Sequence, residues 1–223
     1  MKRILLVCGA GMSTSLLVKK MEEADEKQDY VIHCCDTVSA KLAMLDHDIF
    51  LLAPHVAYMK SEFLPLCESH HIPFLVIETL DYTKMDGLSI LKKVNQVFSD
   101  FEKENPFHIA LLHSHAGAMS DLLLLDMNKK KRHDEKTWVI ESIVIDDFID
   151  DGTYHILLLE PQIRFEERGL RKRIKNQTMI IDVAPMSIYA SFNGRKMLDY
   201  IHQVCDEKIE NEKIKMKEGL EKL

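Results

Sequence analysis

A cysteine stands where a short apolar run meets a loop of small and hydroxylated residues. The apolar run 4–7 ends at Cys8, and the residues after it are Gly9, Ala10, Gly11, Met12, Ser13 and Thr14. Glycines let the backbone turn tightly and bring its N–H groups close to a bound group. A hydroxyl residue is well suited to cap the following helix, whose free N–H groups favour a thiolate and hold an anion. The segment combines a nucleophile with an anion cradle, which predicts phosphoryl transfer onto sulfur.

Three other interpretations of this segment stay open. A buried cysteine before an ordinary glycine turn would need no chemistry. A dinucleotide site would begin at Gly9 and Gly11, but Thr14 stands where the third glycine is expected. Asp36 is only an ambiguous acidic partner for a ribose. A cysteine phosphatase has an arginine six positions after its thiol, where this chain has Thr14, so release to water would be slow. The residues favour a phosphoryl carrier over a hydrolase.

The elements that position this loop follow from alternating apolar runs and amphipathic stretches. We expect strands at residues 3–8, 30–36, 48–53 and 73–77 and helices at residues 13–26, 39–45, 55–70 and 88–103, with a polar turn at 81–87. This alternation predicts an α/β fold, a parallel sheet with helices on both faces. Cys8 would then lie at the carboxyl edge of the sheet, where such folds bind ligands. We expect its sulfur to be open to solvent at the mouth of the loop and to face the first helix.

The pattern restarts after Asn105-Pro106. Leu122, Leu123 and Met127 repeat Leu16, Leu17 and Met21 at an offset of 106 (127 − 21), and Tyr189 and Gly194 repeat Tyr82 and Gly87 at an offset of 107 (194 − 87). A long repeat that occurs twice predicts tandem domains. We expect one domain at residues 1–104 and a second at 105–223, which ends in a helical tail. At the offset of 106, Ser114 falls opposite Cys8.

Composition narrows the class of protein. The 223 residues carry a net charge of −7, which argues against a broad nucleic-acid surface. No apolar run approaches the ~20 residues that span a bilayer. The five cysteines are odd in number and form neither a disulfide framework nor a zinc motif, so we expect reduced thiols in the cytoplasm.

The segment 8–21 resembles the phosphorylation loop and first helix of a known family. The family comprises the lactose/cellobiose/diacetylchitobiose-type EIIB components of the bacterial sugar phosphotransferase system (PTS). The likeness continues through the string LAPHVAYM at 52–59 and the string YTKMDG at 82–87, so that it spans essentially residues 1–103. It implies a three-layer, flavodoxin-like fold with a four-stranded parallel sheet in each domain.

The resemblance also implies an activity. Cys8 would accept phosphate from a phosphohistidine on the EIIA component and pass it to a sugar that the membrane component EIIC imports. A β-disaccharide such as cellobiose, lactose or diacetylchitobiose is the class of sugar implied. The loop of Gly9, Ala10, Gly11, Met12, Ser13 and Thr14 would surround the phosphate, without cofactor or metal. The segment 54–58 would lie beside this loop or be an ordinary start of a helix, and Tyr82 and Asp86 would belong to a docking face or to a solvated turn.

The second half departs from this pattern where the chemistry would occur. Ser114 is a far weaker nucleophile than a thiolate, and Asp121 would repel an anion. We therefore expect a degenerate copy that is not phosphorylated on Ser114, His113 or His115. Because a carrier needs only about 100 residues, this copy keeps an alternative open, a regulatory or scaffold protein that signals sugar supply through Cys8. A redox or phosphatase-like thiol enzyme ranks lower, since the sequence shows no resolving cysteine near Cys8. We expect Cys34, Cys35 and Cys67 to be buried and inert.

Overall fold

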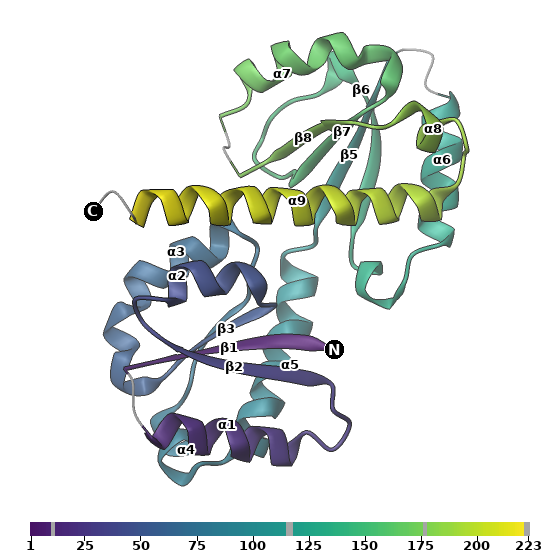
Figure 1. Cartoon of the computed structure of the whole chain (residues 1–223). Helices are drawn as coiled ribbons and strands as arrows, with labels where there is room; N and C mark the ends of the chain where they lie inside the picture. Colours follow the sequence, from purple (N-terminus) through teal and green to yellow (C-terminus); the bar gives the residue numbers. More distant parts are fainter. Residues whose placement is uncertain (10–11, 115–117, 176–177, 221–223) are drawn as a thin grey trace. The chain divides into compact units, whose positions relative to one another are not determined.

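The computed structural model describes residues 1–9, 12–114, 118–175 and 178–220, and the side chains of residues 12, 13, 118, 219 and 220 are outside this description (Figure 1). The chain divides into two compact units, Met1–Glu104 with Lys213–Leu223, and Asn105–Glu212. The grouping of Lys213–Leu223 with the first unit differs from the expected range 105–223 for the second domain.

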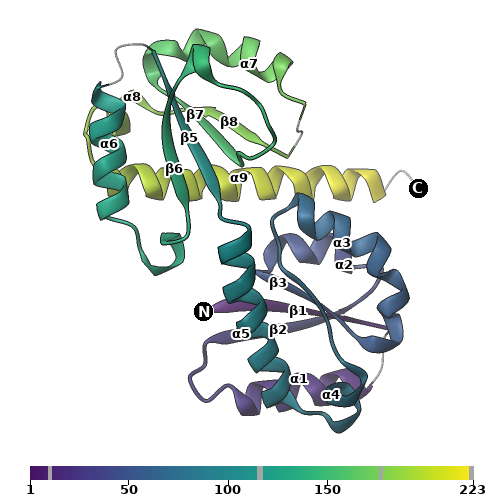
Figure 2. The same cartoon turned by 180° about the vertical axis from the view of Figure 1, so that it is seen from behind.

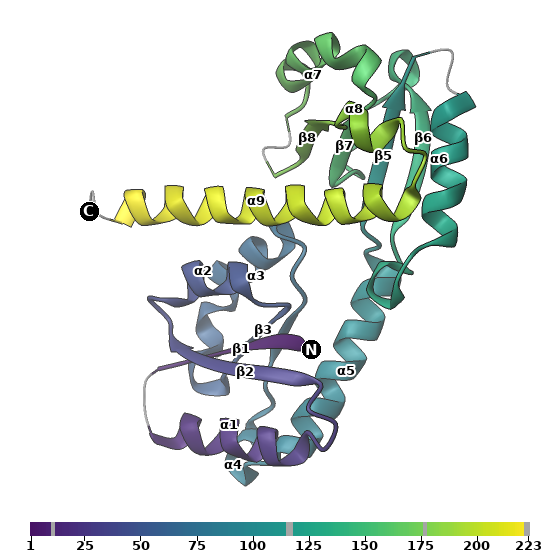
Figure 3. The ribbon, with the colours of Figure 1, turned by 45° about the vertical axis from the view of Figure 1, so that its right-hand side comes forward.

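The first unit is a four-stranded parallel sheet in the order β2-β1-β3-β4. Its elements are β1 (Lys2–Cys8), α1 (Met12–Ala24), β2 (Tyr30–Asp36), α2 (Ala40–Ala43), η1 (Met44–Asp46), β3 (Ile49–Leu52), η2 (Pro54–Met59), α3 (Lys60–Ser69), β4 (Phe74–Val76), α4 (Thr79–Lys84) and α5 (Gly87–Glu104). Helices α1 and α5 cover one face of the sheet, and α2 and α3 cover the other (Figure 3). Because both faces are covered, β1 and β3 are buried along their length, as expected for central parallel strands.

The second unit repeats this plan in the order β6-β5-β7-β8. Its elements are β5 (His108–His113), α6 (Ala118–Lys129), η3 (His133–Glu135), β6 (Val139–Val144), η4 (Ile145–Asp147), β7 (Ile156–Leu159), η5 (Pro161–Glu166), α7 (Glu167–Arg173), β8 (Ile180–Val183), α8 (Met186–Tyr189) and the part of α9 (Gly194–Leu220) up to Glu212. Leu123 of α6 and Met197 of α9 pack on one face of the sheet, and Leu170 of α7 packs on the other (Figure 2). The expected α/β fold with two tandem sheets is confirmed.

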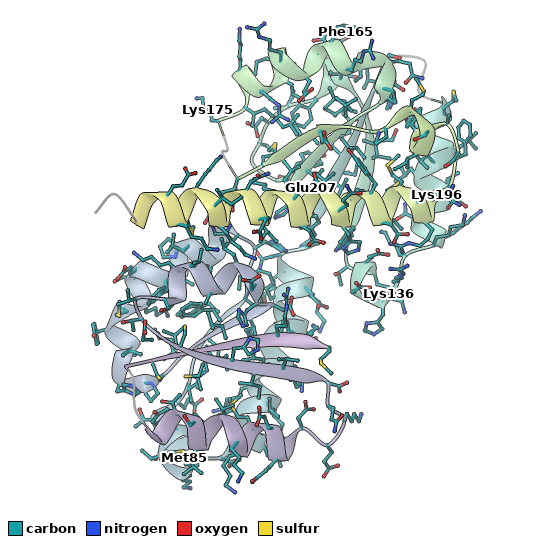
Figure 4. All side chains as sticks on the ribbon, viewed as in Figure 1. Met85, Lys136, Phe165, Lys175, Lys196 and Glu207 are labelled. Carbon is teal, nitrogen blue, oxygen red and sulfur yellow. The ribbon has the colours of Figure 1, made fainter. Side chains whose placement is uncertain are left out.

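One local expectation is wrong. We expect a polar turn at residues 81–87, but helix α4 covers Thr79–Lys84. Met85, labelled in Figure 4, follows this helix. Its backbone is left-handed, with φ 54°. The polar residue Asp81 faces inward and not outward, because Lys93 and Ser89 of α5 donate hydrogen bonds to its carboxylate. Because these hydrogen bonds compensate the burial of the Asp81 carboxylate, a segment with the polar composition of a turn can fold as a helix.

The strand pairing also corrects the alignment of the two halves. Ile4 pairs with Ile49 and Ile109 pairs with Ile156. Strands β3 and β7 are related by an offset of 107 (156 − 49), so their partners β1 and β5 are related by 105 (109 − 4). His113, and not Ser114, therefore corresponds to Cys8. The error has a physical cause, since a strand that is apolar on both faces looks the same after a shift of one residue.

Among the described residues, no helix combines the length and the apolar composition needed to cross a bilayer.

Candidate functional site

Cys8 is the last residue of β1, at the carboxyl edge of the first sheet. The chain passes from β1 to β2 on one side and later to β3 on the other, so β1 is where the strand order reverses. In open α/β sheets the crevice at this reversal is the usual place for a ligand. Helix α1 begins at Met12, shortly after Cys8, and its N-terminus therefore lies at the same edge.

The sulfur of Cys8 faces the first turn of α1. The Thr14 hydroxyl donates a hydrogen bond to Cys8 Sγ at 3.0 Å, and both residues are buried, with exposed fractions of 3% and 2%. A hydroxyl donor stabilises a sulfur anion more than it stabilises a neutral thiol. The low exposure differs from our expectation of a thiol open to solvent at the mouth of the loop.

The loop itself is contacted by a residue from the end of the neighbouring strand. The Gly9 N–H donates a hydrogen bond to His55 Nε2 at 3.1 Å, so this ring nitrogen is the acceptor. The His55 ring packs edge-on against Tyr82, with ring centroids 5.4 Å apart. His55 thus lies directly beside the loop, as expected for the segment 54–58.

The predicted site residues are only partly covered by the structure. Cys8, Gly9 and Thr14 come together around one sulfur and one main-chain donor. Ala10 and Gly11 lie outside the described residues. Met12 and Ser13 form the first residues of α1, and their side chains lie outside the description.

A second sulfur lies beside the first. Cys34 Sγ is 3.6 Å from Cys8 Sγ, and Cys34 is an exposed residue of β2. Partial desolvation of its sulfur and the hydrogen-bonding contact with Cys8 raise the pKa of Cys34 to about 12, so that it keeps its proton. Two expectations are corrected, that Cys34 is buried and that no cysteine lies near Cys8. The sequence could have indicated this contact, because Cys8 and Cys34 fall on two consecutive strands of the predicted parallel sheet.

The corresponding edge of the second unit is built from different groups. His113, which takes the place of Cys8, is buried, and its Nδ1–H donates to the carbonyl oxygen of Ser114 at 2.5 Å. The Ser114 N–H corresponds to the Gly9 N–H, and it donates to Glu160 Oε1 at 2.8 Å. His115, the other expected position, lies outside the described residues.

Glu160 is the centre of a buried hydrogen-bonded network. The Tyr189 hydroxyl donates to Glu160 Oε2 at 2.9 Å, and the Ser120 hydroxyl donates to the Tyr189 oxygen at 2.8 Å. Burial, together with the neighbouring Glu160, raises the pKa of Tyr189 to about 12. These polar groups line a small cavity whose other walls are aliphatic, with Leu111, Leu123 and Met197 among them. The Glu160 carboxylate therefore accepts the hydrogen bond of the main-chain N–H that follows β5. The sequence did not indicate this contact.

Known proteins resemble the first unit. A sequence model described as PTS system, Lactose/Cellobiose specific IIB subunit, matches residues 3–93. The cellobiose-specific EIIB component of Lactococcus lactis subsp. lactis (strain IL1403) is 41% identical over 97 residues, which cover 40% of this chain and 90% of that relative. The galactose-specific EIIB component of Lactococcus lactis subsp. cremoris (strain MG1363) is 40% identical over 97 residues, with the same coverage, 40% and 90%.

A solved structure is similar to less than half of the chain. The solution structure of the cellobiose-specific phosphotransferase IIB component protein from Borrelia burgdorferi shares 32% sequence identity at a TM-score of 0.39 and covers 44% of this chain and 93% of that one. Each of these three matches spans most of the relative and less than half of this chain.

Proposed function

The chain belongs to the lactose/cellobiose-specific IIB family of the PTS, and from this membership we propose that its first unit is a phosphoryl carrier that works through Cys8. The observation that supports this assignment is the Thr14 hydroxyl 3.0 Å from Cys8 Sγ, at the start of α1. A sulfur anion in this position meets a hydroxyl donor and the positive end of a helix.

The proposed reaction has two transfer steps. In the first, the Cys8 sulfur attacks the phosphorus of a phosphohistidine on an EIIA protein, the P–N bond breaks, the S–P bond forms, and the imidazole takes up a proton. In the second, a sugar hydroxyl attacks the same phosphorus, the S–P bond breaks, the O–P bond forms, and the hydroxyl proton is released. The thiolate is regenerated. We assign the N-terminus of α1 and the main-chain N–H of Gly9 as donors to the phosphoryl oxygens, which requires the acceptor His55 Nε2 to release the Gly9 N–H when the phosphoryl group binds.

The residues around the sulfur favour a carrier over a phosphatase. Thr14 stands six positions after Cys8, where a cysteine phosphatase has an arginine. A hydroxyl holds the sulfur but supplies no guanidinium to the phosphoryl group during attack by water. The burial of Cys8, with 2% of its surface exposed, further limits access of water. Transfer from a protein donor requires the groups that cover the sulfur to separate while the donor is docked.

Partners and sugar follow from the family. We propose an EIIA protein as the phosphoryl donor and the membrane component EIIC as the place where the sugar receives the phosphate, with the carrier acting in the cytoplasm. The relatives named above act in cellobiose and galactose systems. A β-linked disaccharide, such as cellobiose, lactose or diacetylchitobiose, is the substrate class that we assign to this chain.

We propose that the second unit is a copy that accepts no phosphoryl group. His113 replaces the thiol, and the Glu160 carboxylate takes the N–H of Ser114 that a phosphoryl oxygen would need. A carboxylate at this point also repels a second anion. This retained but altered copy favours a second candidate function, regulation by the phosphorylation state of Cys8.

A Cys8→Ser variant separates the two candidates. The carrier function predicts that uptake of cellobiose by cells that depend on this protein stops when Cys8 is replaced, because no phosphoryl group reaches the sugar. If uptake continues while a transcriptional or binding response to the sugar is lost, the regulatory function replaces the carrier function. Cys35→Ser is the matched control, since Cys35 is a neighbouring cysteine that does not carry the proposed transfer.

A further inference from the structure

Cys8 and Cys34 lie on the same face of the first sheet. In the pairing of β1 with β2, Leu6 is opposite Cys34 and Cys8 is opposite Asp36. Side chains alternate between faces along a strand, so Cys8 lies on the same face as Leu6, and Cys34 lies on the same face as Ile32. Leu6 and Ile32 belong to one core cluster, so all four side chains lie on one face of the sheet. The two cysteines are therefore diagonal neighbours across the strands, and their sulfurs are 3.6 Å apart. Cys35 points to the opposite face.

We propose that Cys8 and Cys34 form a peroxide-responsive dithiol, in which oxidation to a Cys8–Cys34 disulfide reversibly blocks phosphoryl acceptance. The disulfide itself follows from the geometry, whereas its consequence for phosphoryl transfer rests on the function proposed above. The oxidant is hydrogen peroxide or an alkyl hydroperoxide.

The two sulfurs need a small displacement to bond. A disulfide requires an S–S distance of ~2.05 Å, so the present 3.6 Å must shorten by roughly 1.5 Å. Cys8 is the last residue of β1, and it pairs with β2 but not with β3. Its backbone is therefore less restrained than that of the residues before it. Cys34 is exposed, which gives a small oxidant a path to the sulfur pair.

The chemistry balances with one peroxide for two thiols. The Cys8 thiolate attacks a peroxide oxygen, the O–O bond breaks, and hydroxide leaves and takes up the proton that the thiol released, which yields a sulfenic acid and water. Cys34 then attacks the Cys8 sulfur, the S–O bond breaks, and the departing hydroxide leaves as water with the Cys34 proton. A dithiol reductant returns both thiols.

The environment of Cys34 fixes the order of these steps. Burial and the contact with Cys8 hold the pKa of Cys34 far above neutral pH, so it stays a thiol and reacts slowly with peroxide. Cys8 has a hydroxyl donor on its sulfur, and the Cys34 thiol lies on its other side as a second, weak donor. Cys8 is thus the sulfur that is oxidised first, and Cys34 is the residue that resolves it. A phosphoryl group on Cys8 occupies the attacking sulfur and protects it from peroxide.

The test uses the full chain and hydrogen peroxide at a small molar excess. Remaining thiols are alkylated, and the tryptic peptides are mapped by mass spectrometry. Cleavage after Lys27 and Lys41 leaves Cys34 and Cys35 on one peptide, so the Cys35→Ser variant assigns the bond. We expect a cross-link from Cys8 to Cys34 in the wild type and in Cys35→Ser. In Cys34→Ser we expect no cross-link, and Cys8 proceeds to the sulfinic acid.

The functional readout is recovery of phosphoryl acceptance from a phosphorylated EIIA protein of a cellobiose system. Peroxide should abolish acceptance in all three proteins. Dithiothreitol should restore it in the wild type and Cys35→Ser, and at least tenfold less in Cys34→Ser. Phosphorylation before peroxide should prevent the cross-link.

The proposal is overturned if Cys8 and Cys34 are both alkylated after peroxide treatment, if Cys8 bonds to another cysteine, or if Cys34→Ser recovers as fully as the wild type. The two proposals can fail separately. A Cys8–Cys34 cross-link in a protein that never accepts a phosphoryl group supports the dithiol and contradicts the carrier function.

Discussion

Thr14 is the side chain through which α1 acts on the Cys8 sulfur. Its hydroxyl donates at 3.0 Å inside a buried site, where a hydrogen bond to a charged group is worth about 1.5–3 kcal/mol. Thr14→Val keeps the shape and removes the donor. We expect phosphoryl acceptance by Cys8 to slow by about tenfold or more, since ~1.4 kcal/mol corresponds to a factor of ten.

Rapid-quench measurement of transfer from phosphorylated EIIA tests this prediction. Thr14→Ser is the control, because it retains the hydroxyl and should stay within a few-fold of the wild type. A Thr14→Val protein that accepts phosphate at the wild-type rate would show that the hydroxyl has no role in the transfer.

Glu160 plays a structural part in the second unit. Glu160→Ala leaves the Ser114 N–H and the Tyr189 O–H without an acceptor, and each buried unsatisfied group costs about 1–3 kcal/mol. We expect the free energy of unfolding of this unit to fall by about 2–4 kcal/mol, and by less in Glu160→Gln, which keeps an acceptor. Trp138 is the only tryptophan and packs on Phe107 and His202 in this unit, so its fluorescence in urea follows the transition. Equal stability of Glu160→Ala and wild type would contradict the network.

At the residue scale, the sequence identified Cys8 and Thr14 as candidate site residues, and the structure brings them together, but the sequence did not indicate the contact with Cys34. Cys8 and Thr14 could be found because they fall within one continuous motif. Cys34 and Glu160 could not be assigned, because each reaches its partner across two strands that are distant in sequence. Whether such side chains meet depends on register, which an apolar strand does not encode by itself.

At the scale of elements, a glycine sets how closely two helices approach in each unit. A Cβ on Gly87 would lie 2.3 Å from the Lys20 carbonyl oxygen, and a Cβ on Gly194 would lie 2.3 Å from the Met127 nitrogen. Because these neighbours are backbone atoms, an added methyl group must push the helices apart. We expect Gly87→Ala and Gly194→Ala to lower the free energy of unfolding of their own units by about 1–3 kcal/mol or more.

Gly169→Ala in α7 is the matched control for both variants. The side-chain oxygen of Glu166, 3.9 Å away, would be the nearest atom to the new Cβ, so the methyl group meets no close contact. We expect the free energy of unfolding to stay unchanged or to rise by up to about 1 kcal/mol. Hydrogen exchange of β1 and β5 amides reports the two units separately. Unchanged protection in Gly87→Ala would show that α5 does not approach α1 this closely.

An ion cluster joins η3 to α9 in the second unit. The Glu135 carboxylate is fully buried and accepts hydrogen bonds from Arg195 at 2.5 and 2.6 Å and from His202 at 2.8 Å. Burial alone would raise the pKa of Glu135, but the hydrogen bonds from Arg195, the Arg132 main chain and His202 outweigh it and lower the pKa to about 2. The ionised form is therefore preferred in the folded state.

This cluster predicts an acid-sensitive second unit. A carboxyl group with a folded pKa below its unfolded value of 4.5 stabilises the fold fully above that pH and loses its contribution as the pH falls to about 2. The loss amounts to about 3 kcal/mol. Glu135→Gln should lower stability at pH 7 by a similar amount and flatten the acid dependence, whereas Asp134→Asn, at an exposed neighbour, should change neither. Trp138 fluorescence in urea at pH 2–7 measures both. An unchanged acid dependence in Glu135→Gln would contradict this account.

The order of strands and helices was predictable because short apolar runs alternate with longer amphipathic stretches along the chain. The exception, helix α4, has a buried acid that pairs with Lys93, and pairing partners are invisible to a pattern of polar and apolar residues.

For the whole molecule, the two units share one fold but differ in the residues at the carboxyl edge of the sheet. Both sheets have the same strand order, yet His113 takes the place of Cys8. The main-chain N–H of Ser114, which corresponds to that of Gly9, donates to Glu160. The sequence revealed the repeat through its helices and glycines. It aligned Cys8 with Ser114, because the one-residue insertion before α6 falls in a loop that no periodic pattern constrains.

The most direct measurement is the position and number of phosphoryl groups after incubation with phosphorylated EIIA. Intact mass under neutral conditions and ³¹P NMR count and identify the bond, and peptide mapping locates it. We predict one phosphoryl group per chain, on Cys8 sulfur, and none in Cys8→Ser. Phosphate that persists in Cys8→Ser, or that maps to His113 or Ser114, would contradict the assignment of the carrier to the first unit.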